Sequence, residues 1–263
     1  GIAAGNGASF DGVAPGASIY SVQVFSATPC GSSTCAGAWS SDIVAGLDRI
    51  YQRRASFNFA SVNMSLGGST SYSGTCDTAN SAATTAISNL RSAGIATTVA
   101  SGNSGWVNGM SWPACISSAI SVGSTTKTDA VAYYSNASAN TALLAPGSSI
   151  NSSVPGSSYA VLSGTSMAAP QVAGAYAALK DAYPSASVSD LLTRLQTTGT
   201  PIVDSGNGLT YKRINVKSAI DAVAPTLPGT PSASAGNGKA TVSWSASSSG
   251  GLPVTYTVEA SNG

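Results

Sequence analysis

The residues with the clearest chemical potential lie together in one octapeptide, Ser163-Gly164-Thr165-Ser166-Met167-Ala168-Ala169-Pro170. The Ala-rich, apolar stretch that continues from it predicts a buried helix, which places Ser166 at a helix N-terminus. There the backbone N–H groups and the positive end of the helix dipole face the oxyanion that forms when a serine attacks a carbonyl carbon. Gly164 leaves room for the acyl group. A helix cap alone would explain Thr165 and Ser166, but not the whole octapeptide.

This octapeptide resembles the nucleophile motif of the subtilisin family, with Ser166 at the position of the nucleophile. The resemblance implies a serine endopeptidase that hydrolyses protein or peptide substrates through an acyl-enzyme on Ser166 and requires no cofactor. It covers about residues 1–223 and implies a three-layer α/β/α fold with a mostly parallel sheet.

Two further segments resemble parts of the same site, in the chain order of the family. Residues 62–68, Val-Asn-Met-Ser-Leu-Gly-Gly, resemble the strand end that pairs with the substrate backbone. Residues 99–105, Val-Ala-Ser-Gly-Asn-Ser-Gly, resemble the oxyanion-hole segment, which implies that the Asn103 amide donates to the tetrahedral intermediate. Taken alone, each segment reads as an ordinary glycine turn. The candidate substrate-binding residues are Ser65, Leu66, Gly67, Ala100, Ser101 and Gly102.

The start of the chain resembles the family as well, but the general base is missing. Residues 1–4 resemble the helix directly after the family's His-Gly-Thr-His motif, and residues 11–17 resemble the turn into the next strand. The family's triad runs Asp, His, Ser along the chain, whereas these 263 residues contain no histidine. We therefore expect the triad Asp and His to lie upstream of Gly1. These residues alone should be inactive, because the Ser166 hydroxyl has no acceptor for its proton.

Two other interpretations stay open from the sequence. A sedolisin-like peptidase uses Ser with Glu and Asp, but it places Asp in the oxyanion hole, where Asn103 stands here, and Glu259 in the tail is the only glutamate. The other alternative is a catalytically dead, secreted binding or adhesion protein. The residues encoded before Gly1 would distinguish these alternatives.

The sequence gives only weak signals of substrate specificity and metal binding. The candidate pocket walls, residues 65–67 and 100–102 together with Ser111, carry no acidic side chain that would attract Arg or Lys, so we expect apolar P1 residues. Members of the family often bind calcium. Residues 6–11 supply oxygen donors but form a shorter loop than the family's, so a structural calcium site stays open and no metal ligand is assigned.

The elements that must position these residues alternate between strands and helices. Predicted strands cover residues 19–24, 59–64, 95–100 and 119–122. The first predicted helix has Ser40 or Ser41 as N-cap and places on one face Ile43, Val44, Leu47, Ile50 and Tyr51. The second covers residues 79–91, with Ala79 inward and Gly94 as its stop, and the third covers residues 167–180. A capping box of Ser187 with Asp190 opens the next, which Gly199 ends, and residues 215–223 form the last. Strands separated by helix-length segments predict a parallel sheet covered on both faces.

A Pro-rich linker at residues 224–231 separates this peptidase-like domain, residues 1–223, from a tail at residues 232–263. In the tail, residues 240–244 and 254–258 read as alternating strands and resemble the opening of a fibronectin type III module. Such a sandwich needs roughly 100 residues, so we expect a truncated all-β module.

Composition points to an extracellular hydrolase. Charged residues make up 8% of the chain, against about 25% in average soluble proteins. The net charge of +1 gives no case for nucleic acid or an anionic membrane, and no apolar run approaches a membrane span. We expect a secreted monomer.

The four cysteines support an oxidising compartment. They form no CxxC motif, and with no histidine a zinc site would need all four thiolates, so two disulfides are expected. Spacing favours Cys30 with Cys35 and Cys76 with Cys115. Four free thiols in a cytosolic protein are the alternative.

Overall fold

The computed structural model describes residues 1–7, 10–222, 228–247 and 256–257. Its centre is a six-stranded sheet in the order β11-β12-β8-β7-β5-β3. The strands are β3 (Ser61–Met64), β5 (Ala96–Ala100), β7 (Ile120–Thr125), β8 (Leu143–Pro146), β11 (Thr200–Val203) and β12 (Thr210–Arg213). Every neighbouring pair is parallel except β11 with β12. The burial of all the residues of β5 and β7 follows from a sheet covered on both faces.

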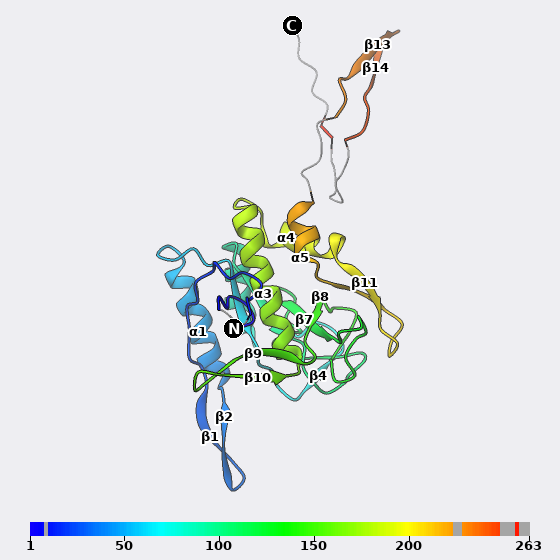
Figure 1. Cartoon of the computed structure of the whole chain (residues 1–263). Helices are drawn as coiled ribbons and strands as arrows, with labels where there is room; N and C mark the ends of the chain where they lie inside the picture. Colours follow the sequence, from blue (N-terminus) through cyan, green and yellow to red (C-terminus); the bar gives the residue numbers. More distant parts are fainter. Residues whose placement is uncertain (8–9, 223–227, 248–255, 258–263) are drawn as a thin grey trace.

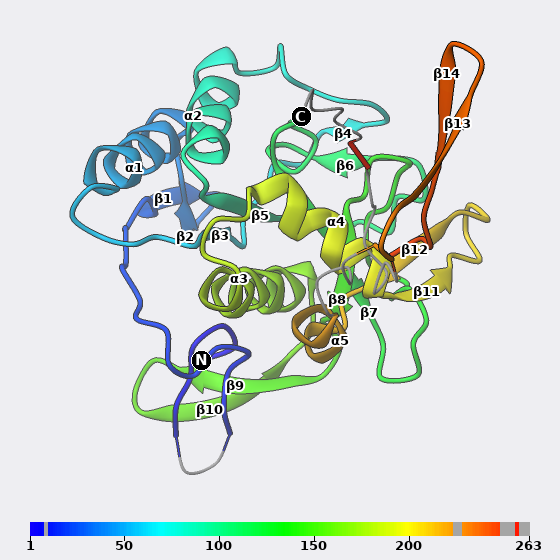
Figure 2. The same cartoon turned by 90° about the horizontal axis from the view of Figure 1, so that it is seen from above.

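Helices cover both faces of this sheet (Figure 2). Helices α1 (Ser40–Arg53) and α2 (Ser81–Ser92) form one core together with Ile95, directly before β5, and Val99 of β5. Helices α3 (Thr165–Ala182), α4 (Val188–Thr198) and α5 (Val216–Asp221) form the other core against β5, β7 and β8. The predicted α/β class, with three layers and a mostly parallel sheet, is confirmed.

Four smaller antiparallel pairs lie outside the central sheet (Figure 1). They are β1 (Ser26–Cys30) with β2 (Ser33–Gly37), β4 (Ser71–Tyr72) with β6 (Met110–Ser111), β9 (Ile150–Val154) with β10 (Ser158–Leu162), and β13 (Ser232–Gly236) with β14 (Lys239–Ser243). The pair β4–β6 lies beside the loops that follow β3 and β5.

Local signals predicted several helix ends correctly. The capping box of Ser187 and Asp190 opens α4, where hydrogen bonds from the Ser187 N–H and hydroxyl to the carboxylate lower the Asp190 pKa. Gly94, at φ +79°, follows the end of α2. The N-cap prediction for α1 was wrong: the helix begins at Ser40 itself, after Trp39, without a side-chain cap. Ala79, predicted to face inward, precedes the Asn80 N-cap of α2 and is exposed.

Two predictions near the N-terminus were also wrong. Residues 19–24 form no strand, although their β-branched side chains favour one, and Ile19 is 71% exposed. A strand needs a hydrogen-bonded neighbour, and none of the described residues pairs with this segment. Residues 2–4 form a turn rather than a helix. This turn packs on α3, where a side chain at Gly174 would stand 2.8 Å from the Ala3 carbonyl oxygen.

The tail is described only in part. The predicted strand at residues 240–244 corresponds to β14, which pairs with β13. The second predicted strand, residues 254–258, lies outside the described residues except for 256–257, and so do residues 224–227 of the predicted linker. The domain boundaries and the fibronectin type III resemblance therefore stay predictions. None of the described helices is long and apolar enough to cross a membrane.

Both disulfides have the predicted partners. Cys30 is bonded to Cys35, across the turn between β1 and β2, and Cys76 is bonded to Cys115. The second pair is buried at 3% and 1% exposure and anchors the segment before α2 to the segment after β6. The two bonds close loops of different length, because the cysteines are 5 and 39 residues apart.

Replacing Cys76 and Cys115 by Ser should cost more stability than replacing Cys30 and Cys35. Loop-closure entropy alone gives about 4 kcal/mol for the long loop and about 2 kcal/mol for the short one, and only the long-loop variant leaves two buried hydroxyls. Denaturant unfolding of the two double variants measures the difference. Equal denaturation midpoints for the two double variants would contradict the prediction that the long-loop disulfide contributes more stability.

Candidate active site

The candidate site lies where β3 and β5 end. The two strands are parallel neighbours with Met64 opposite Val99, so the loops that follow them leave the same edge of the sheet. Helix α3 crosses β3, β5 and β7 and brings its first turn to that edge. The Ser65 hydroxyl donates to the carbonyl oxygen of Ser166 at 2.8 Å, which ties the first loop to the start of the helix.

The Asn103 side chain is fixed by the residue before the candidate nucleophile. Its Oδ1 accepts hydrogen bonds from the backbone N–H of Thr165 at 2.8 Å and from the Thr165 hydroxyl at 3.0 Å. Thr165 Oγ1 in turn accepts from the Gly102 N–H at 3.2 Å. Because an amide has its donor and acceptor at opposite ends, fixing the oxygen sets where the N–H groups of Asn103 point.

Two free donors flank one point beside Gly164. A methyl group placed on Gly164 would stand 3.4 Å from Nδ2 of Asn103, 3.6 Å from its Oδ1 and 3.7 Å from the backbone nitrogen of Ser166. Neither nitrogen donates to any described residue. Unpaired N–H donors at the start of a helix are groups that can bind an anionic oxygen.

The candidate nucleophile lacks a base in this chain. Ser166 is half-buried, and its hydroxyl makes no hydrogen bond to the described residues. No histidine occurs anywhere in the 263 residues. The described residues thus place unpaired N–H donors beside Ser166, and the chain contains no imidazole for proton transfer.

Ser111 packs closely against both loops. Gly67 and Gly102 both approach Ser111: a Cβ on Gly67 would stand 3.2 Å from Ser111 Cβ, and one on Gly102 would stand 2.5 Å from Ser111 Oγ. Ser111 is also held to the β5 loop by its N–H, which donates to the Ser101 carbonyl at 3.0 Å. The sequence singled out Ser111 only as a third wall, and the structure brings it to both loops.

The predicted substrate-binding residues differ in how accessible their side chains are to a substrate. Ser65, Leu66 and Gly102 are half-buried and Gly67 is exposed, whereas Ala100 and Ser101 are 4% and 0% exposed. Only the backbone of those last two can line a pocket, since the Ala100 side chain lies in the core and the Ser101 hydroxyl donates to the Asn136 carbonyl. The N–H of Gly68 donates to the Trp112 carbonyl at 2.9 Å, so it is not free for a substrate strand.

A large groove of about 1310 Å³ runs beside the nucleophile. Its walls are the unpaired residues 19–24, the apolar side of α1, the edge strand β3, the β9–β10 hairpin and one side of α3. Met167, the residue after Ser166, lines it. The N-terminal segment enters this region between α1 and α3 (Figure 1). Two extended segments thus share a groove in which neither has a partner on that side.

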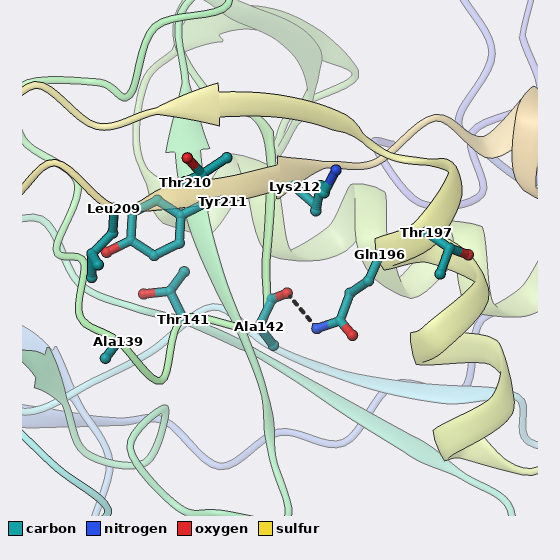
Figure 3. A pocket seen from close by; sticks show the side chains of 9 residues that line it. All are labelled: Ala139, Thr141, Ala142, Gln196, Thr197, Leu209, Thr210, Tyr211 and Lys212. Atoms are coloured by element: carbon teal, nitrogen blue, oxygen red, sulfur yellow. Dashed lines mark hydrogen bonds between the residues drawn. The ribbon is translucent and has the colours of Figure 1, made fainter. Parts of the chain in front are cut away.

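A second hollow, of about 550 Å³, lies away from these residues, between β12, α4 and the loop before β8 (Figure 3). The Gln196 amide crosses it to donate to the Ala142 carbonyl at 3.1 Å. Burial raises the pKa of the Tyr211 phenol, partly offset by a hydrogen bond from Asn207. Lys212 is its only charged lining residue, and none of the candidate catalytic residues lines it.

The described residues contain no group of three or more His, Cys, Asp or Glu that could hold a metal ion. Residues 8 and 9 of the candidate calcium segment lie outside the description, and Asn6 and Asp11 form a single antiparallel bridge. The calcium site therefore stays an untested prediction.

Comparison with known proteins decides the family. The sequence profile of the subtilase family matches residues 1–238. The chain belongs to the subtilase family. It is 35% identical to subtilisin DY of Bacillus licheniformis over 214 residues, which are 79% of this chain and 70% of that protein. It is 38% identical to an extracellular serine proteinase of Thermus sp. (strain Rt41A) over 199 residues, which are 75% of this chain and 44% of that protein.

The fold of this subtilase agrees with solved relatives. The crystal structure of a cold-adapted subtilisin-like serine proteinase superposes with a TM-score of 0.57 at 29% identity, covering 68% of this chain and 63% of that chain. The similarity extends over most of this subtilase but only part of the relatives' own length.

The sequence missed one residue that organises the site. Asn136 is completely buried and hydrogen-bonds to the loop that carries Asn103. It belongs to no motif, and an isolated Asn in a polar loop gives no signal of such contacts. Thr165 lay inside the recognised octapeptide, but its bonds to Asn103 were not foreseen.

Gly102→Ala should destabilise the fold by roughly 2–4 kcal/mol, through a strained backbone and an overfilled site. Gly102 has φ +112°, and an added methyl group would overlap Asn136 Nδ2 and press on Ser111 Oγ. Gly16→Ala is the matched control, because nothing lies within 4 Å of its added methyl group. Thermal unfolding measures both. A Gly102→Ala protein as stable as Gly16→Ala would refute this packing around Gly102.

Proposed function

We propose that this chain is the nucleophile-bearing part of a subtilisin-like serine endopeptidase. Ser166 attacks the scissile carbonyl, and the Asn103 amide and the Ser166 N–H stabilise the oxyanion of the tetrahedral intermediate. The observation that carries the proposal is the pair of unsatisfied donors beside Gly164, adjacent to Ser166. The substrates are proteins or peptides, in line with the subtilisins to which the chain is similar.

The general base comes from polypeptide outside these residues, as the lack of histidine requires. We place that polypeptide in the groove beside α3. The groove is bordered by residues 19–24, which lack a partner among the described residues, and by β3 at the sheet edge. An inserted strand would complete the backbone hydrogen bonds of both borders and cover apolar surface of α1 and α3.

Two further features belong to the proposal. The loop residues 65–67 and 100–102 and the neighbouring Ser111 carry no carboxylate, which favours apolar P1 side chains. The disulfides and the similarity to an extracellular proteinase support secretion. No cofactor is required for the proposed acyl transfer.

Labelling with a fluorophosphonate tests the nucleophile. The 263-residue chain should not label, because no imidazole accepts the Ser166 proton. A longer protein that includes the upstream coding sequence should label, and Ser166→Ala in that protein should abolish labelling. Both proteins contain Ser166, so the comparison isolates the supplied base. A folded longer protein that fails to label would leave the inert binding protein as the better interpretation.

Asn103→Leu in the longer protein should lower kcat about 10²–10³-fold with little change in KM, since this bond forms mainly in the transition state. That size is the one found when the corresponding donor is removed from subtilisin, not one calculated from this structure. Asn89→Leu, on the exposed face of α2, is the matched control and should leave kcat unchanged. Steady-state kinetics on a peptide substrate measure both, and a parental kcat for Asn103→Leu would remove it from the oxyanion hole.

A further inference from the structure

One buried side chain from a distant part of the sequence hydrogen-bonds to the loop that carries Asn103 on both sides of that residue. Asn136 Oδ1 accepts hydrogen bonds from the backbone N–H groups of Ser104 at 2.9 Å and Trp106 at 3.1 Å. Its Nδ2 donates to the Ser101 carbonyl at 3.2 Å and to Ser111 Oγ at 3.4 Å. Both acceptor and both donor positions of the amide are used.

The backbone of Asn136 binds the same loop. Its N–H donates to the Gly102 carbonyl at 2.9 Å, and its carbonyl accepts from the Ser101 hydroxyl at 2.7 Å. The loop is therefore fastened on both sides of Asn103, at residues 101–102 and at residues 104–106. Asn136 itself is 0% exposed, so it can touch no substrate.

We propose that Asn136 is a positioning residue for the oxyanion hole. Asn103 receives its orientation from two directions: its Oδ1 is held by Thr165, and its backbone is held by Asn136 through the residues before and after it. Thr165 alone fixes one end of an exposed side chain. Asn136 sets how far the loop lies from the start of α3, and therefore the distance between Asn103 Nδ2 and the point beside Gly164.

The neutrality of the amide matters for this role. A buried side chain that must accept from two N–H groups and donate to a carbonyl needs both a donor and an acceptor in one rigid plane, which Asn provides without charge. An aspartate would keep the acceptors but would face the Ser101 carbonyl without a donor. Removing the amide would leave the N–H groups of Ser104 and Trp106 without these acceptors, and the loop could relax.

The inference rests on the proposed function, and its test uses the longer protein whose labelling at Ser166 has first been established. Asn136→Ala should lower kcat about 10–100-fold, the cost of misplacing a catalytic group by about 1 Å, with a smaller change in KM. In an Asn103→Leu background the same substitution should lower kcat less than about twofold, because the amide that it positions is already gone. A loss of equal size in both backgrounds, or a parental kcat for Asn136→Ala, would overturn the proposal.

Ser121→Ala is the matched control for a buried polar deletion. Ser121 is 2% exposed and bridges the Asn140 carbonyl and the Ala142 N–H, both at 2.9 Å, away from the Asn103 loop. It should lower the unfolding temperature but leave kcat within about twofold of the parent. A kcat loss in Ser121→Ala as large as in Asn136→Ala would mean that general destabilisation explains the effect, and would overturn the positioning role.

Two further measurements keep the test decisive. If Asn136→Ala does not fold, Ser101→Ala removes only the 2.7 Å bond to the Asn136 carbonyl, and it should give a smaller kcat loss that also disappears in the Asn103→Leu background. A parental kcat for Ser101→Ala would then count against the proposal. Independently of activity, amide hydrogen exchange at Ser104 and Trp106 should accelerate in folded Asn136→Ala. Unchanged exchange there would contradict the contacts on which the inference depends, whereas failure of the parent to label would concern the proposed function alone.

Discussion

The structure of the site depends on the contact of one amide oxygen with the start of one helix. Asn103 Oδ1 accepts both hydrogen bonds that Thr165 can offer it, from the backbone N–H and from the hydroxyl. This contact joins the end of β5 to the first turn of α3, two elements that are each fixed in the core. It also satisfies an N–H that a helix start would otherwise leave unpaired, and it leaves the nitrogen of the amide and the N–H of Ser166 free on the same side. The same two hydrogen bonds thus stabilise the start of α3 and leave both N–H donors available to an oxyanion.

Two sets of polar groups lack hydrogen-bond partners among the described residues, and the two sets would bind different partners. The donors beside Gly164 are few, local and next to Ser166, so a small anionic oxygen satisfies them. Residues 19–24 and the edge strand β3 are extended and apolar on one side, and only another strand would complete their backbone hydrogen bonds. In the proposed function, the first set binds the oxyanion and the second set pairs with a further strand of the fold. A polypeptide that fills the groove and carries a base would therefore complete both at once, because Met167 places the groove next to the nucleophile.

Sequence patterns could predict what short-range physics determines. The capping box at Ser187, the termination of α2 at Gly94 and the buried character of α3 follow from neighbouring residues, and the structure has them. The strand predicted at residues 19–24 fails for the opposite reason, since β propensity is realised only against a partner from elsewhere. In the candidate site, a contiguous motif singled out Ser166 and, together with it, Asn103, whose catalytic roles stay predictions. Asn136 could not be found in this way, because its contacts join loops that are distant in sequence and an asparagine looks the same whether it forms a turn or a network.

The low charge of the chain shapes how this site would respond to pH. The network around the oxyanion position consists of amides, hydroxyls and backbone groups, and the hydrogen bonds of Asn103, Thr165 and Asn136 involve no ionisable side chain. Titration between about pH 5 and 9 therefore leaves the orientation of the donors unchanged. In a salt-bridged site, a pH profile would mix the ionisation of the base with changes in geometry. If the chain acts as proposed, the pH dependence of the reaction would therefore report the ionisation of the base supplied to Ser166 and not a change in the geometry of the oxyanion hole.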